Sequence, residues 1–269
     1  MPLKRIIIAL IFIPLLIFCI LRGGIVFLGL VCIIIGGGLF EFYQGMKKED
    51  RNLFLIEGIC LGLVVPVSVY LWGEGILPLI LTLSIFFLFL RQFLSFETRK
   101  AFINISLTLG GILYISVLFS YVLILRNNPP LTGAGSLSGA RLVMTVFFVT
   151  WMADTSAYFI GGKWGRHKLF PRFSPYKSLE GLIGAVLVSC IAMFISQLWL
   201  SFSLTHTLIL GISVGIMGQV GDFFESMLKR EVGIKDFGKI LPGHGGILDR
   251  FDSLLFTIPF FYYYIKYLV

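Results

Sequence analysis

Charged residues are scarce in this chain of 269 residues: they make up 13% of it, where globular proteins average roughly 25%. Hydrophobic residues make up 57%, and the mean hydropathy is +0.95. This much apolar surface must be buried, which excludes a disordered chain and a collagen-like fibre. The four cysteines lie in apolar runs and form no CxxC pair, so they indicate neither disulfides nor zinc ligands. The composition indicates an integral membrane protein.

The sequence contains many long apolar runs. A bilayer core about 30 Å thick needs about 20 helical residues. The first run follows Lys4 and Arg5, as in a signal peptide, but no small-residue cleavage site follows it, so we expect a retained helix. The sequence predicts an all-α polytopic membrane protein with about nine transmembrane helices, at residues 4–21, 25–43, 53–72, 75–93, 103–125, 142–161, 182–203, 205–225 and 251–269.

The basic residues are distributed unevenly between the two sides of these runs. With the N-terminus in the cytoplasm, 18 of the 22 Lys and Arg residues fall on the cytoplasmic side. This bias predicts a multi-pass protein of the cytoplasmic membrane, with the N-terminus inside and the C-terminus outside. The net charge of +8 then faces anionic headgroups, so we expect lipid phosphates or nucleotides as partners and no nucleic acid.

The chain divides into two halves by the placement of its ionisable residues. We expect 1–125 to be a scaffold, 126–141 an external connecting loop, and 142–269 the half that carries the chemistry. Glu41 and Glu57, in the first half, lie close enough to the cytoplasmic edge to reach water. No fixed-period repeat is present, which counts against repeat-built transporters.

Asp154 lies well inside the predicted helix at 142–161. A carboxylate at that depth is costly, and it indicates a functional site by default. The alternative is a neutral aspartic acid that hydrogen-bonds a neighbouring helix for packing alone.

The predicted cytoplasmic loop at 173–181 offers hydroxyl groups and an ammonium group. Ser174, Lys177 and Ser178 could hold phosphate oxygens. Ser178 is equally suited to be an ordinary helix N-cap.

Charge density is highest between Gly221 and Asp252. Asp222 and Glu225 are spaced i, i+3, and Asp249 and Asp252 repeat that spacing, so two helix ends could present oxygen ligands to a hard cation. Glycines among the cations, at 243, 245 and 246, would let backbone N–H groups approach a phosphate. A solvated loop whose charges pair with one another is the alternative.

A stripe of small residues, Gly211, Gly215 and Gly218, leads down the same helix to Asp222. Small residues at this spacing let membrane helices approach closely. We expect the stripe to set the distance from Asp222 to Asp249.

The stretch from Ser226 to Asp252 resembles the signature of the phosphatidate cytidylyltransferase (CDP-diacylglycerol synthase) family. The blocks around Asp154, at 174–181 and at 221–226 resemble that family in order and length, while Tyr176 and Ser178 stand where its members usually have Lys and Thr. The signature residues that match are Ser226, Lys229, Arg230, Lys235, Asp236, Pro242, His244, Gly245, Gly246, Asp249, Arg250 and Asp252.

The resemblance implies transfer of a cytidylyl group from CTP to phosphatidate with Mg²⁺, and a second cation could share the site. It implies metal ligands at Asp222 and Asp249, with Asp252 or Asp154 placing the second cation. The implied catalytic residues are Asp222, Asp249, Lys229, Arg230, His244 and Arg250. The implied substrate-binding residues are Ser174, Lys177, Ser178, Lys235, Lys239, Gly245 and Gly246.

Two alternatives stay open at this point. A transferase acting on another lipid phosphate, such as an ether lipid, would share the chemistry, whereas a transporter would need ionisable residues across the whole membrane. The sequence does not decide between acyl and ether chains, between CTP and dCTP, or between a monomer and a homodimer.

The distribution of basic residues predicts the topology. In a cysteine-free background, single cysteines at positions 135 and 235 should react with an impermeant thiol reagent from opposite sides of the membrane. The measurement is labelling of intact cells against inverted vesicles, and reaction of both positions from outside contradicts the topology.

Overall fold

The computed structural model describes residues 2–47, 53–96, 100–129, 136–171, 174–238 and 245–269, which form two units. The first unit comprises Met1–Asn128 with Asp236–Arg250, and the second comprises Pro129–Lys235 with Phe251–Val269. The boundary near residue 128 lies within the connecting loop expected from the sequence. The expected roles of the two halves stay predictions, and the segment Asp236–Arg250 groups with the first half of the chain.

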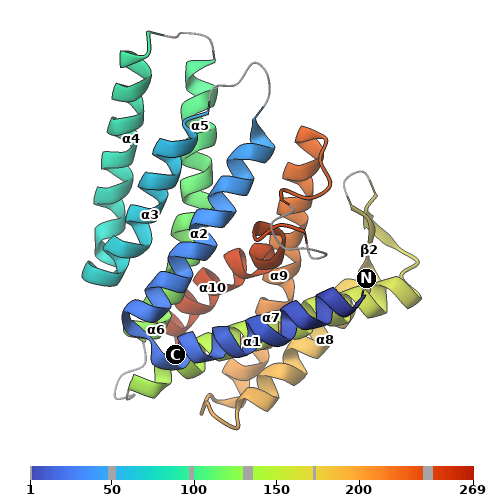
Figure 1. Ribbon diagram of the computed structural model, residues 1–269. Coiled ribbons are helices and arrows are strands. Elements are labelled where there is room, and N and C mark those ends of the chain that lie inside the picture. The colour runs from blue at the N-terminus through green and yellow to red at the C-terminus, as the bar shows by residue number, and fades with distance from the viewer. Residues whose placement is uncertain (1, 48–52, 97–99, 130–135, 172–173, 239–244) are drawn as a thin grey trace. The chain divides into compact units, whose positions relative to one another are not determined.

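The first unit is built from the N-terminal helices. α3, α4 and α5 pack in turn beside one another (Figure 1). α5, η2 and α6 follow without a break, and η2 is a turn of π-helix. The bounds are α1 Pro2–Arg22, α2 Gly24–Met46, α3 Leu55–Trp72, the 3-10 helix η1 Glu74–Ile76, α4 Leu77–Leu94, α5 Ala101–Gly111, η2 Ile112–Val117 and α6 Leu118–Asn127.

A buried tyrosine fastens α2 to α5 in this unit. The Tyr43 hydroxyl donates a 2.8 Å hydrogen bond to the Thr108 carbonyl. Its ring passes between Gly58 and Gly111, where an added Cβ would come within 2.8 Å and 2.6 Å of ring atoms. Glycine at both places is therefore what leaves room for the ring.

The two glutamates of the first half behave differently from each other. Glu57 is partly exposed and accepts a 2.8 Å hydrogen bond from Arg91 on α4. Glu41 is only 2% exposed, so the expectation that it reaches water is wrong. Its carboxylate accepts a hydrogen bond from the Leu248 N–H instead.

The second unit contains α7, α8, α9, the greater part of α10, and a small hairpin between α7 and α8 (Figure 1). The Trp199 indole donates to Thr145, and Thr150 bonds Thr257, which ties α7 to the chain after α8 and to α10. The bounds are α7 Ser136–Trp164, β1 Lys168–Phe170, β2 Ser174–Ser178, α8 Leu179–Ser196, α9 Leu204–Val232 and α10 Leu248–Leu268.

The hairpin departs from the purely helical fold expected from the sequence. β1 and β2 pair antiparallel, with Lys168 opposite Ser178 and Phe170 opposite Ser174. Backbone groups beside an apolar phase need hydrogen-bond partners, and two short strands supply them to each other. Pro175 is compatible with this position because each strand has only one neighbour in the two-stranded sheet.

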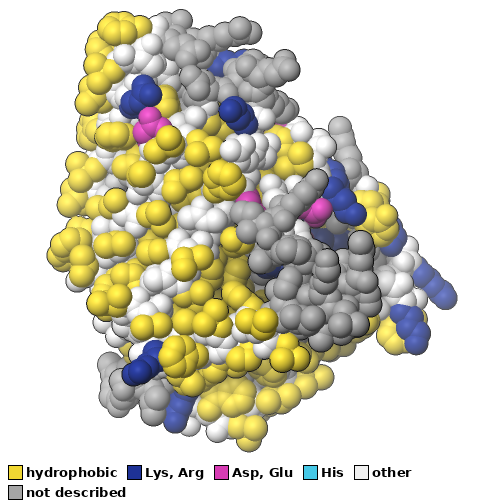
Figure 2. Space-filling view, viewed as in Figure 1, with side chains coloured by type: hydrophobic (Ala, Val, Ile, Leu, Met, Phe, Trp, Pro, Cys, Tyr) yellow, Lys and Arg dark blue, Asp and Glu magenta, His cyan; other side chains and the backbone are white. Residues whose placement is uncertain are grey.

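The structure is consistent with the expected all-α polytopic membrane protein. Hydrophobic side chains cover much of the visible face (Figure 2). α10 is not among the candidate spans, and Leu10–Arg22 of α1 is a shorter apolar helix, so nine spans stay a prediction. Within the described residues, seven helices are long and apolar enough to cross a membrane, namely 24–46, 55–72, 74–94, 101–127, 138–164, 179–196 and 204–232.

The glycine stripe of α9 faces mainly α8. A Cβ at Gly211 would lie 2.7 Å from the Cys190 Cα, and one at Gly215 would lie 2.9 Å from the Val186 Cα. Gly218 has only ordinary contacts, of 3.6 Å or more. The glycine that brings α9 tightly against α10 is Gly221, where a Cβ would lie 2.6 Å from the Asp252 carbonyl oxygen. The stripe therefore sets the spacing of α8 and α9.

Candidate metal centre

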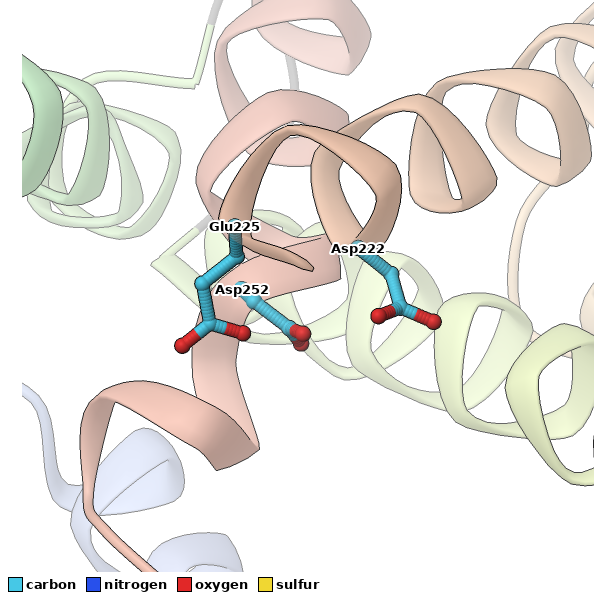
Figure 3. A group of neighbouring side chains, drawn as sticks. All are labelled: Asp222, Glu225 and Asp252. Atoms are coloured by element: carbon cyan, nitrogen blue, oxygen red, sulfur yellow. The ribbon is translucent and has the colours of Figure 1, made fainter. Parts of the chain in front are cut away.

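Three carboxylates from two helices of the second unit converge. Asp222 and Glu225 lie on α9, and Asp252 lies on α10. One oxygen from each lies within 4.8 Å of the others. Figure 3 shows the three side chains projecting to the same side of the crossing of α9 and α10. The i, i+3 spacing places the first two on one face of α9, and Gly221 lets α10 bring in the third.

The spacing of these oxygens fits a divalent cation. Mg²⁺ binds oxygens at about 2.1 Å in an octahedron, so neighbouring ligands lie about 3.0 Å apart and opposite ligands about 4.2 Å apart. Oxygens within 4.8 Å of one another would need to draw together to reach that geometry, which rotation of the carboxylate side chains allows. Carboxylates are the ligands that such hard cations prefer. The centre could therefore hold one cation between α9 and α10.

Two lysines neutralise the carboxylates of the centre. The Lys177 Nζ, on β2, lies 2.7 Å from the Asp222 Oδ1, and its ammonium sits 4.3 Å from the centre of the Phe223 ring. The Lys229 Nζ lies 3.1 Å from the Glu225 Oε2. The glutamate side chain is fully buried and that of Lys229 is 12% exposed, so this pair is shielded from water. Buried charges are tolerated when paired in this way.

Asp154 on α7 borders the centre and is held by hydrogen bonds. Its Oδ1 accepts from the Gln219 amide at 3.2 Å and from the Ser253 hydroxyl at 3.1 Å. Asp222 and Asp252 are near enough for their charges to act on it. Asp154 thus hydrogen-bonds to α9 and α10, as expected if it serves only in helix packing. A role for Asp154 in placing a second cation stays a prediction.

The hairpin residues predicted to bind substrate lie beside the centre. Lys177 bonds Asp222 and also donates to the Ser226 hydroxyl at 3.4 Å. Ser178 caps α8, because its Oγ accepts the Gly181 N–H at 3.2 Å. Ser174 is buried, with 8% of its surface exposed. Phosphate contacts from these three residues stay predictions.

Several predicted site residues belong to the first unit or fall outside the described residues. Asp249 accepts the Gly246 N–H at 2.9 Å within the first unit, so its pairing with Asp222 stays a prediction. Gly245 has a φ of +85°, a conformation that favours glycine. The structure also shows Arg250 exposed, while Lys239 and His244 lie outside the described residues.

The basic residues at the end of α9 differ in their surroundings. Arg230 is exposed and donates to the Ile234 carbonyl at 3.1 Å, closing the end of the helix. Lys235 is exposed. Both are exposed, and their roles at the site stay predictions.

Glu225 is the residue that the predicted ligand set left out. The i, i+3 relation to Asp222 was the signal that could have included it. In the sequence, Glu225 looks like a surface glutamate. The packing of α10 against α9 is what buries Glu225 beside Asp252.

A helical membrane protein with a carboxylate centre that could hold a cation, flanked by two lysines, is the class that this fold and site define. The chain belongs to the cytidylyltransferase family, whose model matches residues 3–268. It is similar to the phosphatidate cytidylyltransferase of Staphylococcus haemolyticus, with 33% identity over 265 residues, 96% of this chain and 95% of the relative. The Staphylococcus aureus protein of that name is 30% identical over 264 residues, with the same coverage. That of Staphylococcus saprophyticus is 37% identical over 175 residues, 64% of each chain.

The contact at Gly221 predicts a sensitive position. Gly221→Ala would place a methyl group against the Asp252 backbone, so α9 and α10 must separate by a few tenths of an ångström. We expect the apparent Mg²⁺ affinity to fall about 10-fold or more, as when the support of a metal ligand is lost. The measurement is the Mg²⁺ midpoint of activity.

Gly162→Ala is the matched control on α7, because a Cβ there meets nothing within 4 Å. Equal midpoints for the two variants would contradict the role given to Gly221.

Proposed function

We propose that this protein transfers the cytidylyl group of CTP to phosphatidate, giving CDP-diacylglycerol and pyrophosphate. The observation that carries the proposal is the carboxylate centre with Lys177 and Lys229 at its edges, in a chain that aligns over 96% of its length with a phosphatidate cytidylyltransferase. A polyphosphate nucleotide needs a cation and nearby Lys or Arg residues, and the centre combines both features.

The reaction must bring two anions together. An oxygen of the phosphatidate phosphate attacks the α-phosphorus of CTP, and the bond from that phosphorus to the bridging oxygen of the β-phosphate breaks. Pyrophosphate leaves with the electron pair of that bond. No protein nucleophile is needed, because the lipid phosphate is the attacking group. The protein's task is therefore to hold the two substrates and to offset their charge.

The acidic residues would hold Mg²⁺. Asp222, Asp252 and Glu225 are the described candidates, and Asp249 is the further ligand proposed from the sequence. When bound, the cation would neutralise oxygens of the triphosphate and of the developing pyrophosphate. A second cation beside Asp154 is part of the proposal.

The basic residues would bind the phosphates. Lys177 and Lys229 already lie against Asp222 and Glu225, so each could turn from its carboxylate toward a phosphate oxygen by rotating its side chain. Arg230 and Lys235 are exposed at the end of α9 and could meet the outer phosphates. Ser174, Ser178, Lys239, His244, Gly245, Gly246 and Arg250 complete the proposed set.

The location follows from the substrates and from the distribution of charge. We propose nine spans in the cytoplasmic membrane, with the N-terminus inside, the C-terminus outside and the site on the cytoplasmic face, where CTP is available. In the second unit, the hairpin and the C-terminal part of α9 lie at the same end of the helices, as this topology requires. Both a monomer and a homodimer are compatible with the proposal.

The alternatives are weaker on specific grounds. A transporter needs a polar path through the membrane, whereas five ionisable side chains of the second unit, Asp222, Glu225, Asp252, Lys177 and Lys229, gather around one centre. A transferase for another lipid phosphate would share every feature of that centre. Phosphatidate is favoured because it is the substrate in the names of the relatives.

A direct assay tests the reaction and its metal requirement. Detergent-solubilised protein given labelled CTP and phosphatidate should form CDP-diacylglycerol and pyrophosphate with Mg²⁺, and should form neither after chelation. An ether-linked lipid phosphate, dCTP and a flux assay in vesicles are the comparison arms. Turnover of the ether lipid alone would instead indicate a transferase for another lipid phosphate. Flux without turnover would indicate a transporter.

The ligand assignment predicts which carboxylates matter most. Asp222→Asn and Asp252→Asn should each lower turnover by about 100-fold or more, because loss of a supporting group alone costs about 10 to 100-fold. Glu231→Gln, at an exposed position of the same helix, should stay close to the wild type. Initial rates at saturating Mg²⁺ decide, with thermal unfolding as the check on folding. Near-normal turnover of either aspartate variant would refute its assignment.

A further inference from the structure

Glu41 is a buried carboxylate in the half of the chain that the sequence analysis regarded as scaffold. It lies on α2, in an apolar span, with 2% of its surface exposed. Burying an ionisable group among apolar helices is costly, so its position there needs a reason. The reason lies in what its two oxygens contact.

The Glu41 carboxylate meets the first turn of α10. Its Oε2 accepts the N–H of Leu248, the first residue of that helix, at 3.0 Å. The first N–H groups of a helix have no partner within the helix. A carboxylate there also interacts favourably with the helix dipole. Glu41 therefore caps a helix that begins 207 residues later in the chain.

Two glycines make room for this carboxylate. A Cβ at Gly246 would lie 2.5 Å from the Glu41 Oε2, and a Cβ at Gly238 would overlap the carboxylate from another side. The neighbouring Phe237 packs its ring 5.7 Å from that of Phe42. Gly238 and Gly246 thus both lie closely against the Glu41 carboxylate.

The close packing extends to Asp249, the aspartate proposed as a further metal ligand. Asp249 follows Leu248, and its Oδ2 accepts the N–H of Gly246 at 2.9 Å. A Cβ at Gly246 would also lie 2.8 Å from that oxygen. Glu41 and Asp249 therefore hold N–H groups two residues apart, with Gly246 packed between their carboxylates.

We infer that Glu41 is a positioning residue: by capping α10 at Leu248 it fixes where Asp249 presents its carboxylate. This inference rests on the proposed function, because it takes Asp249 to be a ligand. It gives Glu41 a part in the proposed function through Asp249, within the same unit.

The test compares variants at Glu41 that keep or remove the acceptor. Glu41→Gln keeps an oxygen of the same size and position, so its Mg²⁺ midpoint should stay within about threefold of the wild type. Glu41→Leu fills the space without a hydrogen-bond acceptor. Its Mg²⁺ midpoint should rise about 10-fold or more, because loss of a group that supports a metal ligand typically lowers metal affinity by that factor. Mn²⁺ binding followed by electron paramagnetic resonance gives the same comparison without turnover.

Glu57→Leu is the matched control, because it removes a glutamate from a span of the same unit while sparing α10. Its metal midpoint should not change, even if its thermal stability falls. Gly238→Ala should reproduce the effect of Glu41→Leu, because it displaces the carboxylate without removing it.

A folded Glu41→Leu protein with the wild-type midpoint would overturn the inference, as would a Gln variant as impaired as the Leu variant. If Glu41→Leu does not fold, Gly238→Ala decides by the same criterion. Wild-type protein that binds Mn²⁺ but forms no CDP-diacylglycerol would count against the proposed function, and Mn²⁺ binding would still decide the role of Glu41.

Discussion

Compensation of charge inside an apolar helical bundle is the constraint on which the rest of the site depends. Asp222, Glu225 and Asp252 approach one another, and like charges at such distances repel strongly where the dielectric constant is low. Lys177 and Lys229 offset part of that repulsion. The Lys177 pair also links the hairpin between α7 and α8 to α9. Without Lys177, Asp222 would lack the ammonium group that pairs with it. Without Gly221, α10 could not bring Asp252 close to Asp222 and Glu225.

Local patterns in the sequence were sufficient for the helices and for part of the site. Each of the nine apolar runs coincides for most of its length with a helix in the described residues, because length and hydropathy are properties of a single segment. The run at 182–203 is the largest departure, since its helix ends at Ser196. The Ser178 cap also follows from four consecutive residues, 178–181, because its Oγ accepts the Gly181 N–H. The i, i+3 relation of Asp222 to Glu225 was visible for the same reason.

Contacts between distant segments were not predictable from such patterns. Glu41 seemed free to reach water, because nothing in its own helix reveals the Leu248 N–H that it accepts. The glycines of α9 share one stripe in the sequence, yet Gly211 and Gly215 meet α8 while Gly221 meets α10. Which helix faces a stripe depends on tertiary packing. The hairpin was missed because three to five residues per strand carry too little periodicity.

The ion pair of Lys177 with Asp222 has a consequence for how the protein is made. Many small metal sites cannot fold until the ion arrives, because their ligands repel one another without it. Here a tethered ammonium group, 18% exposed, lies beside the carboxylate in the folded chain. The chain therefore carries a counterion for Asp222 within its own fold. Folding of the centre does not require a bound ion to offset the charge of Asp222.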